Sequence, residues 1–377
     1  MQHLIYLIKR EFDYFWSNKV FVFAFLCLPL LLALVLGFVY KKGRINDQPI
    51  ILVDLDGSPW SGRLSDMLED SPVLKVVVVK HEMVDLHQHL LDYRAVAVVV
   101  IPHRFEANLL HQLRPEVNCY LNMANTLTSG AVGGAVSQCI ATLNGGILKQ
   151  ETIRHNVFYQ YNSSGNYLYF LWPGLIFSVL QQLLLLALAV SFSREVEQQY
   201  FNLEGLLKYS QSAFMLILVK IIPYVLLSFI TMGVYFLLSG YFRIPLPRYP
   251  GLFLLSQLLM VLGTCFLGVF YSIIYPMSLK ASQLLMSIAS PAFTISGFTW
   301  PADQMPAFLE MFAQIIPLTP FLKALRMILF QEASWQDIAP QFMHQLILIL
   351  VFWGAGIVLL HVKINKGRAT HRLISRA

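Results

Sequence analysis

Six apolar runs, each long enough to cross a bilayer as a helix, constrain this chain more than any other feature of its sequence. A helix needs about 20 mostly apolar residues to cross the hydrocarbon core. None of the runs carries a charge at its centre, where a charged side chain costs about 2.5–3.5 kcal/mol on insertion scales. Lys220 lies near one end of the third run and is expected to snorkel to the interface. The predicted spans are residues 20–40, 167–192, 213–242, 251–279, 281–300 and 343–361.

The composition excludes a water-soluble protein. Hydrophobic residues make up 56% of the 377 residues and charged residues only 13%, whereas soluble domains carry about 25% charged residues. The net charge of +6 is concentrated at span ends and in the C-terminal tail, unlike the single basic face of a nucleic-acid-binding protein. We therefore expect no nucleic acid partner.

The C-terminal tail decides the predicted orientation. Residues 362–377 hold five basic residues and no acidic residue, a pattern typical of a cytoplasmic segment that attracts anionic lipid. Because the number of predicted spans is even, both termini are predicted to be cytoplasmic. The first span gives no preference, because Lys9, Arg10 and Lys19 before it balance Lys41, Lys42 and Arg44 after it.

Residues 1–19 are predicted to form an amphipathic helix on the cytoplasmic membrane surface. One helical face carries aliphatic and aromatic side chains that suit the headgroup layer. These side chains are Leu4, Ile8, Phe12, Phe15 and Trp16. The alternative is a cytoplasmic extension of the first span, residues 20–40.

Residues 41–166 are predicted to form an extracytoplasmic α/β domain. Strands alternate with helices along this segment, which indicates a largely parallel or mixed sheet. Strands are expected at 50–54, 74–79, 95–101 and 117–121, helices at 61–69, 82–91 and 105–113, and a longer helical return at about 125–155. The predicted fold class is therefore an α-helical polytopic membrane protein with an inserted α/β domain.

Two loops stand out in the five-span part, residues 167–361. The cytoplasmic loop 193–212 is charged and amphipathic, which suits docking to a soluble partner, although an ordinary solvated loop fits the same pattern. The segment 301–341 is expected to be external. Pro291 and the turn-forming residues after it predict that the fifth span stops short and returns in a partly re-entrant segment.

Asp54 and Asp56 follow a predicted strand and resemble the nucleophile motif of haloacid-dehalogenase-type phosphatases. Such a site also needs a downstream acidic pair, and we find no convincing one. The alternative is a strand that ends in an Asx-type turn. Asx-type turns are common at strand ends, so we favour this interpretation.

Clustered histidines and cysteines in the same domain raise the question of a metal site or a disulfide. The histidines are His81, His87, His89, His103 and His111. No usual ligand spacing is completed, so a solvated face is favoured over a metal or pH-sensing role, and no metal is predicted. Cys119 and Cys139 are able to pair if the domain faces an oxidising compartment.

The spans carry few polar groups with which to drive transport. Gln181 and Gln182 either form interhelical hydrogen bonds or line a pathway. The scarcity of ionisable groups in the spans argues against an ion-coupled carrier. The sequence also lacks a Gly-x-x-x-x-Gly-Lys-Ser/Thr loop. If transport is driven by ATP, both the ATP and the Mg²⁺ belong to a partner ATPase, and this chain needs no cofactor.

An ordered set of motifs resembles the permease subunits of type-2 ABC (ABC-2) exporters, in the subgroup with a large external domain after the first span. The set covers nearly the whole chain. The similar segments are Asp54-Leu-Asp-Gly-Ser58, Ile101-Pro-His-Arg-Phe105, Arg194-Glu-Val-Glu197, Ser296-Gly-Phe-Thr-Trp-Pro301 with Met305-Pro306, and Ile316-Pro-Leu-Thr-Pro320 with Leu325-Arg326. One departure is the missing Gly-Thr after Arg-Glu-x-Glu, with extra residues before Glu204.

The resemblance implies a coupling loop that an ATPase contacts through Arg194, Glu195, Glu197 and Glu204. Charge reversal at Glu195 and Glu197 is then expected to uncouple the ATPase without unfolding the protein. Two permease copies, identical or different, would form the path in a bacterial inner membrane, with one ATPase beneath each copy.

The pathway or gate is expected to include Gln181, Gln182, Ser296, Gly297 and Phe298. An apolar path suits an amphipathic, drug-like or lipid-like substrate. The resemblance further implies a periplasmic adaptor and an outer-membrane channel as partners. The alternative function is a membrane sensor or scaffold whose external domain binds a ligand or partner.

Overall fold

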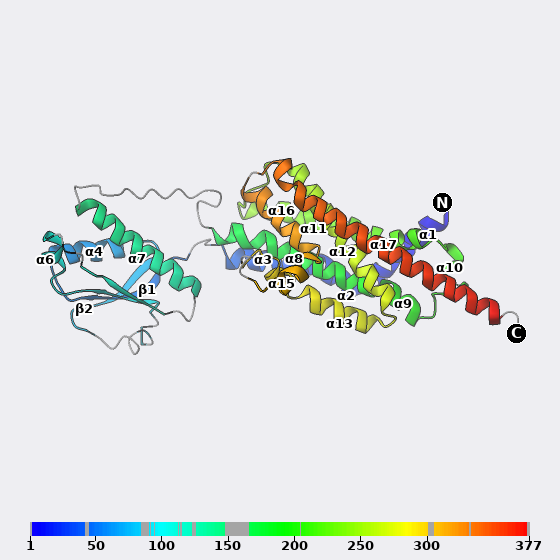
Figure 1. Cartoon of the computed structure of the whole chain (residues 1–377), viewed down its shortest axis with the longest axis horizontal. Coiled ribbons are helices and arrows are strands. Elements are labelled where there is room, and N and C mark those ends of the chain that lie inside the picture. The colour runs from blue at the N-terminus through cyan, green and yellow to red at the C-terminus, as the bar shows by residue number, and fades with distance from the viewer. Residues whose placement is uncertain are drawn as a thin grey trace. The chain divides into compact units, whose positions relative to one another are not determined.

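The computed structural model folds the chain into two compact units, Met1–Gly43 with Gln160–Ala377, and Arg44–Tyr159. Figure 1 shows an all-helical first unit and a second unit built on a sheet. The residues that the structure describes are 2–41, 45–83, 90, 92–93, 95–111, 113, 115–122, 126–147, 166–203, 205–300, 305–331 and 333–374.

Five helices of the first unit are long and apolar enough to cross a membrane. By length and composition, the candidates are Lys19–Val39, Tyr167–Glu197, Ala213–Tyr241, Pro250–Ile274 and Trp335–Lys366. The corresponding elements are α2 (Lys19–Val22), η1 (Phe23–Cys27), α3 (Leu28–Val39), α8 (Tyr167–Ala189), α9 (Ser191–Glu197), α11 (Ala213–Tyr241), α12 (Pro250–Ile274) and α17 (Trp335–Ile374). These helices confirm a polytopic helical membrane protein.

The predicted span 281–300 is interrupted at Pro291, in line with the expectation that it stops short. Helix α13 (Ser278–Ala289) ends just before Pro291, which has no N–H to donate, and the chain turns into the short α14 (Ala292–Ile295). This broken segment nevertheless runs antiparallel to α8 and α9. Ser278 bonds to Glu197, the Ala289 carbonyl accepts from Gln182, and Phe298 packs on Gly174. The chain therefore passes along α8 here without a continuous helix.

The segment 301–341, predicted to be external or re-entrant, contributes helices that pack within the helical unit. Helices α15 (Ala307–Gln314) and α16 (Leu318–Phe330) are bent by 86° at a short break, and together they are apolar enough to be one broken span or a re-entrant loop. Most of α16 is buried, including Phe321 and Leu325. The predicted re-entrant return is therefore better assigned to α15 and α16, because α13 and α14 already run along α8.

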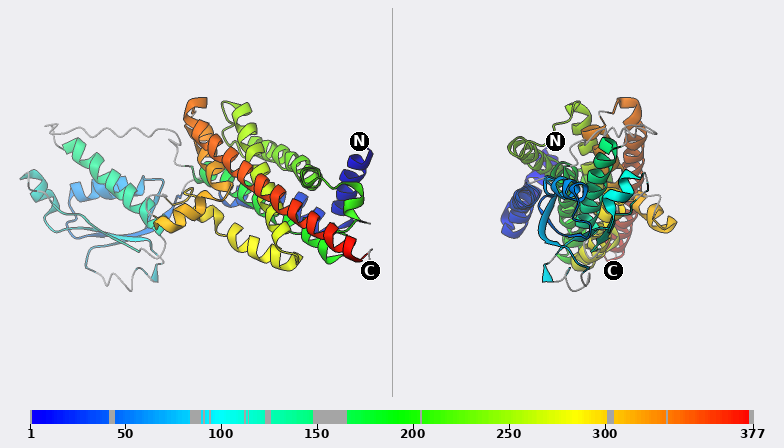
Figure 2. Two further views of the ribbon diagram at one scale, coloured as in Figure 1. Left: turned by 45° about the vertical axis from the view of Figure 1, so that its right-hand side comes forward. Right: turned by 90° about the vertical axis from the view of Figure 1, so that its left-hand side faces the viewer.

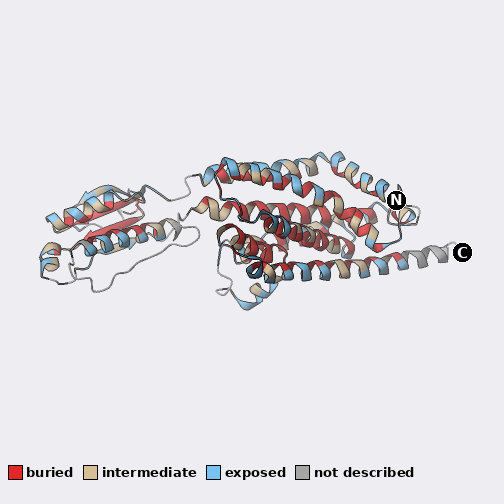
Figure 3. Ribbon diagram, turned by 90° about the horizontal axis from the view of Figure 1, so that it is seen from above, coloured by how far each residue is buried: buried red, intermediate tan, exposed pale blue. Residues whose placement is uncertain are grey.

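The first span is held to the second by one buried hydrogen bond. The Trp172 indole N–H of α8 donates to the Ala33 carbonyl of α3 at 2.8 Å. The π-helical turn η1 precedes Pro29, and wide turns of this kind accommodate local breaks in the hydrogen-bond ladder. Much of this span remains exposed on the isolated chain, as Figure 3 shows, and so does much of α17.

The N-terminal helix α1 (Gln2–Ser17) buries a face that overlaps the predicted apolar face only in part. Leu7, Glu11 and Phe15, spaced four residues apart, are buried, whereas Trp16 is 52% exposed. The helix packs against α11 and against α10 (Leu206–Tyr209). Figures 1 and 2 show α1 and the end of α17 at the same end of the helical unit.

The second unit confirms the inserted α/β domain. Its four-stranded sheet has the order β2–β1–β3–β4, in which β1 pairs in parallel with β2 and β3, and β4 is antiparallel to β3. The strands are β1 (Gln48–Asp54), β2 (Leu74–Lys80), β3 (Ala97–Ile101) and β4 (Asn118–Leu121), and the helices are α4 (Pro59–Glu69), α6 (Phe105–Leu110) and α7 (Thr126–Ile147). Side chains of β1 alternate between two cores, Ile50 and Leu52 in one and Ile51 and Val53 in the other.

Asp54 organises the turn after β1, as the Asx-turn interpretation predicts. Its carboxylate accepts from the N–H groups of Asp56 and Gly57 and from the Ser61 hydroxyl, which completes a capping box with Ser58. Burial raises the pKa of Asp56, but hydrogen bonds from Ser58 and from backbone N–H groups of α6 outweigh it and hold that pKa below its usual value. Both carboxylates are thus occupied in holding the turn and α6.

Candidate functional site

Five charged side chains from three separate segments meet at one end of the helical unit. α1 contributes Arg10 and Glu11, α9 contributes Arg194 and Glu195, and α11 contributes Lys220. The Lys220 Nζ lies 2.5 Å from Glu195 Oε1 and 2.7 Å from Glu11 Oε1. Arg10 also donates to Glu195, and Arg194 Nη2 lies 3.6 Å from Glu195 and 3.8 Å from Glu11. We call this group the charge cluster.

The charge cluster is buried by the chain itself. Glu195 is 0% exposed and Lys220 1% exposed, so the expectation that Lys220 snorkels is wrong. Three cations and two carboxylates leave a formal charge of +1 inside the protein. Removing one partner of a buried ion pair typically costs about 3–5 kcal/mol, because the other charge is left uncompensated. The cluster therefore fixes α1, α9 and α11 relative to one another.

Aromatic rings enclose the two arginines of the charge cluster. The Arg194 guanidinium lies over the Tyr14 ring, 3.0 Å from its centroid, and the Arg10 guanidinium lies 4.6 Å from the centroid of the Tyr200 ring. Such cation–π contacts favour arginine and strengthen when water is excluded. Tyr200 belongs to the loop 193–212, so this loop is bound to α1 by a ring as well as by ions.

A single hydroxyl positions α9 at the end of α8. The Ser272 Oγ of α12 accepts from the backbone N–H groups of Phe192 at 2.6 Å and Ser193 at 3.0 Å. The first N–H groups of a helix have no partner within it, and here a neighbouring helix supplies one. Gly268, one turn earlier on α12, allows close approach, because a Cβ there would lie 2.8 Å from the Leu188 side chain.

The loop 193–212 turns sharply at Gln199. Tyr200 N–H donates to the Glu195 carbonyl and Gln199 N–H to the Val196 carbonyl, which is the Schellman arrangement that ends many helices. Gln199 has φ 55°, a left-handed conformation that favours glycine. The glycine that is absent after Arg-Glu-x-Glu corresponds to this position in the motif that the chain resembles. Gln199 therefore adopts a left-handed conformation that glycine would adopt more readily.

The sequence-predicted coupling residues fall into different environments. Arg194 and Glu195 are buried in the charge cluster. Charge reversal at Glu195, which we expected to leave the fold intact together with reversal at Glu197, would place like charges together in that cluster. Glu197 is exposed, and its carboxylate accepts from the Ser278 N–H at 2.8 Å and hydroxyl at 2.5 Å at the start of α13. Glu204 lies outside the described residues.

The predicted pathway residues lie further along α8 and after α14. Gln182 Nε2 donates to the Ala289 carbonyl at 3.5 Å, whereas the amide of the fully buried Gln181 has no hydrogen-bond partner among the described residues. Ser296 Oγ accepts from the Phe298 N–H, and Gly297 has φ 82°, which only glycine adopts readily.

An arginine that was not assigned to a site holds that turn in place. Arg326 of α16 donates to the carbonyls of Gly297 and Phe298, and its guanidinium lies 5.0 Å from the centroid of the Phe298 ring. Phe298 in turn fills the space above Gly174, where a Cβ would lie 2.7 Å from its ring. The Leu-Arg motif therefore secures the turn after α14 against α8.

The cysteines and histidines of the second unit form no reactive centre among the residues that the structure places. Cys119 and Cys139 are free thiols on one core, and burial raises the pKa of both. The Cys139 thiol donates to the Met67 carbonyl at 3.3 Å. His87 and His89 lie outside the described residues, and within those residues no group of three possible metal ligands occurs.

Sequence reasoning missed the contributions of Arg10, Glu11, Lys220 and Ser272 to this site. A signal was available for Glu11, which lies four residues from both Leu7 and Phe15 on the buried face of α1. Lys220 stands seven residues inside α11, next to Pro223, in an otherwise apolar run. Ser272 gave no signal, because its role depends on the contact between α12 and α9.

A helical unit with five long apolar helices, an inserted α/β unit and a charged loop packed beneath the helices define a multi-pass membrane transport subunit. The sequence model of the ABC-2 family transporter proteins matches residues 19–359, so the chain belongs to the ABC-2 transporter family. The family assignment confirms the resemblance found in the motifs.

Three named relatives agree with this assignment. The chain is 21% identical over 313 residues to the inner membrane transport permease YhhJ of Escherichia coli, covering 80% of this chain and 82% of that protein. It is 20% identical over 326 residues to the probable multidrug ABC transporter permease YbhR of Escherichia coli, covering 84% and 88%. It is 29% identical over 173 residues to the probable multidrug ABC transporter permease YbhS of the same organism, covering 45% of each chain. The chain is thus a permease subunit of the inner membrane.

Proposed function

We propose that this chain is the permease of an ATP-driven exporter that moves an amphipathic, drug-like or lipid-like substrate out of the cytoplasm or the inner leaflet. Two permease copies form the path, and a separate ATPase binds beneath each. Both termini are cytoplasmic, which is supported by the basic tail and by the position of α1 and the end of α17 at one end of the unit. The observation that carries the proposal is the charge cluster, which joins the loop 193–212 to α1 and α11.

Force on the loop reaches the spans through this cluster. Glu197 is exposed and forms the point of ATPase contact, and it is bonded to Ser278 at the start of α13. Arg194 and Glu195 do not touch the ATPase in this proposal. They transmit its movement, because buried ion pairs resist separation more strongly than exposed ones. A displacement of α9 thereby moves α1, α11 and α13 together.

The path itself runs along α8. Gln181 is included in it, because a fully buried amide with no protein partner among the described residues is a costly feature that needs an explanation. Ser296, Gly297 and Phe298 form a gate at the other end of α8, where Phe298 packs on Gly174. The external α/β unit is proposed to dock a periplasmic adaptor that leads to an outer-membrane channel.

The test compares two neighbouring exposed residues of the loop. Glu197→Lys is expected to lower permease-stimulated ATP hydrolysis about tenfold in the purified complex, whereas the control Gln198→Lys is expected to leave it within twofold, since a single lost charge-assisted contact is worth about 1.5–3 kcal/mol. Both variants should keep the wild-type melting temperature within a few degrees.

Recovery of the partner is measured in the same preparation. Mild-detergent purification of the tagged chain followed by mass spectrometry should recover an ATPase in about equal amount. Unchanged hydrolysis in Glu197→Lys would exclude Glu197 as the coupling contact. Purification without any ATPase, under conditions that preserve a control transporter, would favour the sensor or scaffold function instead.

A further inference from the structure

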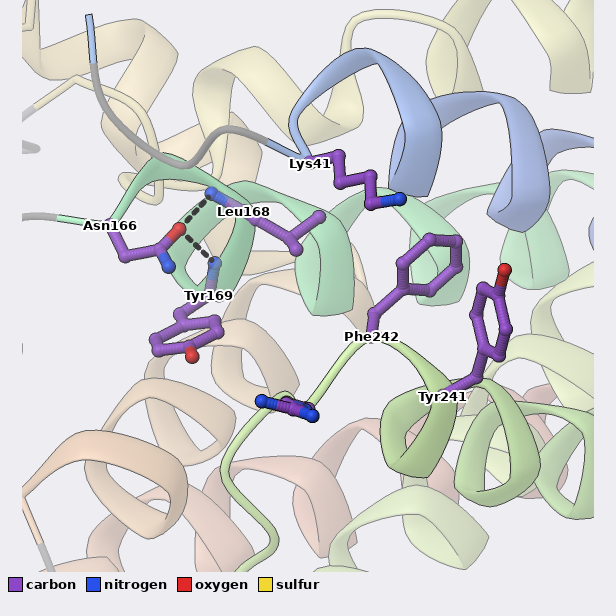
Figure 4. A pocket seen from close by; sticks show the side chains of 7 residues that line it. Lys41, Asn166, Leu168, Tyr169, Tyr241 and Phe242 are labelled. Atoms are coloured by element: carbon purple, nitrogen blue, oxygen red, sulfur yellow. Dashed lines mark hydrogen bonds between the residues drawn. The ribbon is translucent and has the colours of Figure 1, made fainter.

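A cavity of about 480 Å³ lies at the end of the helical unit opposite the charge cluster. It is formed where α3 ends, α8 begins and α11 ends, and it is lined by Lys41, Asn166, Leu168, Tyr169, Tyr241, Phe242 and Arg243. Figure 4 shows Lys41, Tyr241 and Phe242 on one side of the opening, and Asn166 and Tyr169 on the other. We call it the outer cavity.

The outer cavity is lined by two cations that have no protein anion beside them among the described residues. In the part of the chain that the structure describes, no carboxylate lies within ion-pair distance of Lys41 or Arg243. The three stretches of sequence that contain the lining residues, numbers 14–46, 152–194 and 205–302, have no Asp or Glu at all. Lys41 and Arg243 are both exposed basic side chains, and without a carboxylate beside them among the described residues they create a local field that favours a negatively charged ligand.

The rest of the lining suits the part of an amphipathic molecule where the charged headgroup joins the apolar body. Phe242 and Leu168 are buried apolar side chains, and Tyr169 and Tyr241 combine an apolar ring with a hydroxyl, as in residues enriched at the level of lipid headgroups. The start of the 23-residue helix α8 faces the same space, and a helix N-terminus adds partial positive charge. A free inorganic ion uses the cations but not the rings.

The backbone at Arg243 adds an independent observation. Arg243 ends α11 in a Schellman arrangement, with Ile244 N–H bonded to the Ser239 carbonyl, and it has φ 54°. Glycine is strongly preferred at such a position, and strained non-glycine residues concentrate at functional sites. A basic side chain here is also disfavoured by the positive-inside rule if the loop is external.

We propose that the outer cavity binds the acidic headgroup of an amphipathic molecule at the external surface of the inner membrane. The headgroup is a phosphate or carboxylate attached to an apolar body. Lys41 and Arg243 bind the anion, and Tyr169, Tyr241 and Phe242 hold the adjoining apolar part. The external position rests on the orientation in the proposed function. Binding itself needs no ATPase.

The experiment measures binding to the purified full chain in neutral detergent. Dihexanoyl phosphatidylglycerol is titrated against dihexanoyl phosphatidylcholine by microscale thermophoresis, with inorganic phosphate as competitor. The wild type should prefer the anionic lipid. Lys41→Gln and Arg243→Gln should each weaken that preference about fivefold and the double variant about 30-fold, since a basic residue near an anionic headgroup is worth about 1 kcal/mol.

Controls separate loss of binding from loss of fold. Arg248→Gln removes a cation from the same loop outside the lining and should bind as the wild type does, whereas Arg243→Lys should largely retain binding. Equal loss in Arg248→Gln, or retained preference in the double variant with a wild-type melting temperature, overturns the proposal. Complete competition by millimolar phosphate, with equal affinity for lipid and phosphate, overturns the amphipathic part and leaves an adventitious ion only.

Access from the outer side is tested separately. In sealed proteoliposomes of known orientation, anionic lipid added to the outer face should protect an introduced Asn166→Cys thiol from a membrane-impermeant maleimide, in a variant whose exposed Cys27 is replaced by serine. Protection from the opposite face only would overturn the external position, and with it the orientation, while the binding result would stand. Because none of these measurements uses ATP, failure of the ATPase pull-down leaves them interpretable.

Discussion

The two ends of the helical unit differ in whether their charged side chains are buried and paired. At one end, Glu195 and Lys220 are buried and paired in the charge cluster. At the other, Lys41 and Arg243 line an open cavity with no carboxylate beside them among the described residues. Both ends carry excess positive charge, but only the first supplies its own anions. The comparison indicates that the charge cluster holds the protein together, whereas the outer cavity is left for a ligand.

The largest expected effect comes from removing the central cation of the charge cluster. Lys220→Met should destabilise the protein by about 3–5 kcal/mol, because Glu11 and Glu195 are then buried without the cation that bridges them. The yield of monodisperse protein and its melting temperature in detergent measure this. Lys280→Met, at an exposed position on α13, is the matched control. Equal stability of the two variants would show that the cluster is not structural.

A smaller effect is expected at the hydroxyl that starts α9. Ser272→Ala removes the acceptor of two backbone N–H groups, and an unsatisfied buried donor costs about 1–3 kcal/mol. The variant should lower the melting temperature and also weaken ATPase coupling, because α9 carries Arg194 and Glu195. Ser287→Ala, exposed on α13, should change neither property. A melting temperature equal to that of the wild type would contradict this role.

The smallest effect distinguishes the two strained helix ends directly. Gln199→Gly and Arg243→Gly should each stabilise the protein by about 0.5–1 kcal/mol, because glycine relieves the left-handed strain at some entropic cost. Only Arg243→Gly should weaken binding of an anionic lipid, by about fivefold. The melting temperature and lipid titration of both variants provide the measurement. Similar binding losses at both positions would remove the contrast between the two ends.

The fold was predictable where a segment's own pattern determines it. Strand β1, helix α4 and the long helices α8 and α11 follow from hydrophobic runs and from a capping box, which are local features. The break at Pro291 was predicted from the proline, whereas the burial of α16 was not, because apolar composition predicts membrane depth without showing whether the chain crosses or returns.

The candidate site was predictable only in part, for a related reason. The motif around Arg194 and Glu195 indicated an important loop, and the structure places that loop in the charge cluster. The exposure of its residues depends on partners that come from distant parts of the sequence. From the sequence alone, a carboxylate such as Glu195 is predicted to be exposed. Its burial follows only from the contacts with Lys220 and Arg10, which come from other helices.

The bond between Lys220 and Glu11 joins residues that are 209 positions apart, and this separation has a consequence for synthesis. The N-terminal helix leaves the ribosome long before its partner, so Glu11 has no bond to Lys220 while the α/β unit and α8 are being made. Lys220 then emerges with both of its carboxylate partners already made. A chain truncated between α1 and α11 lacks this cation, so the charge cluster is completed only after α11 has been synthesised.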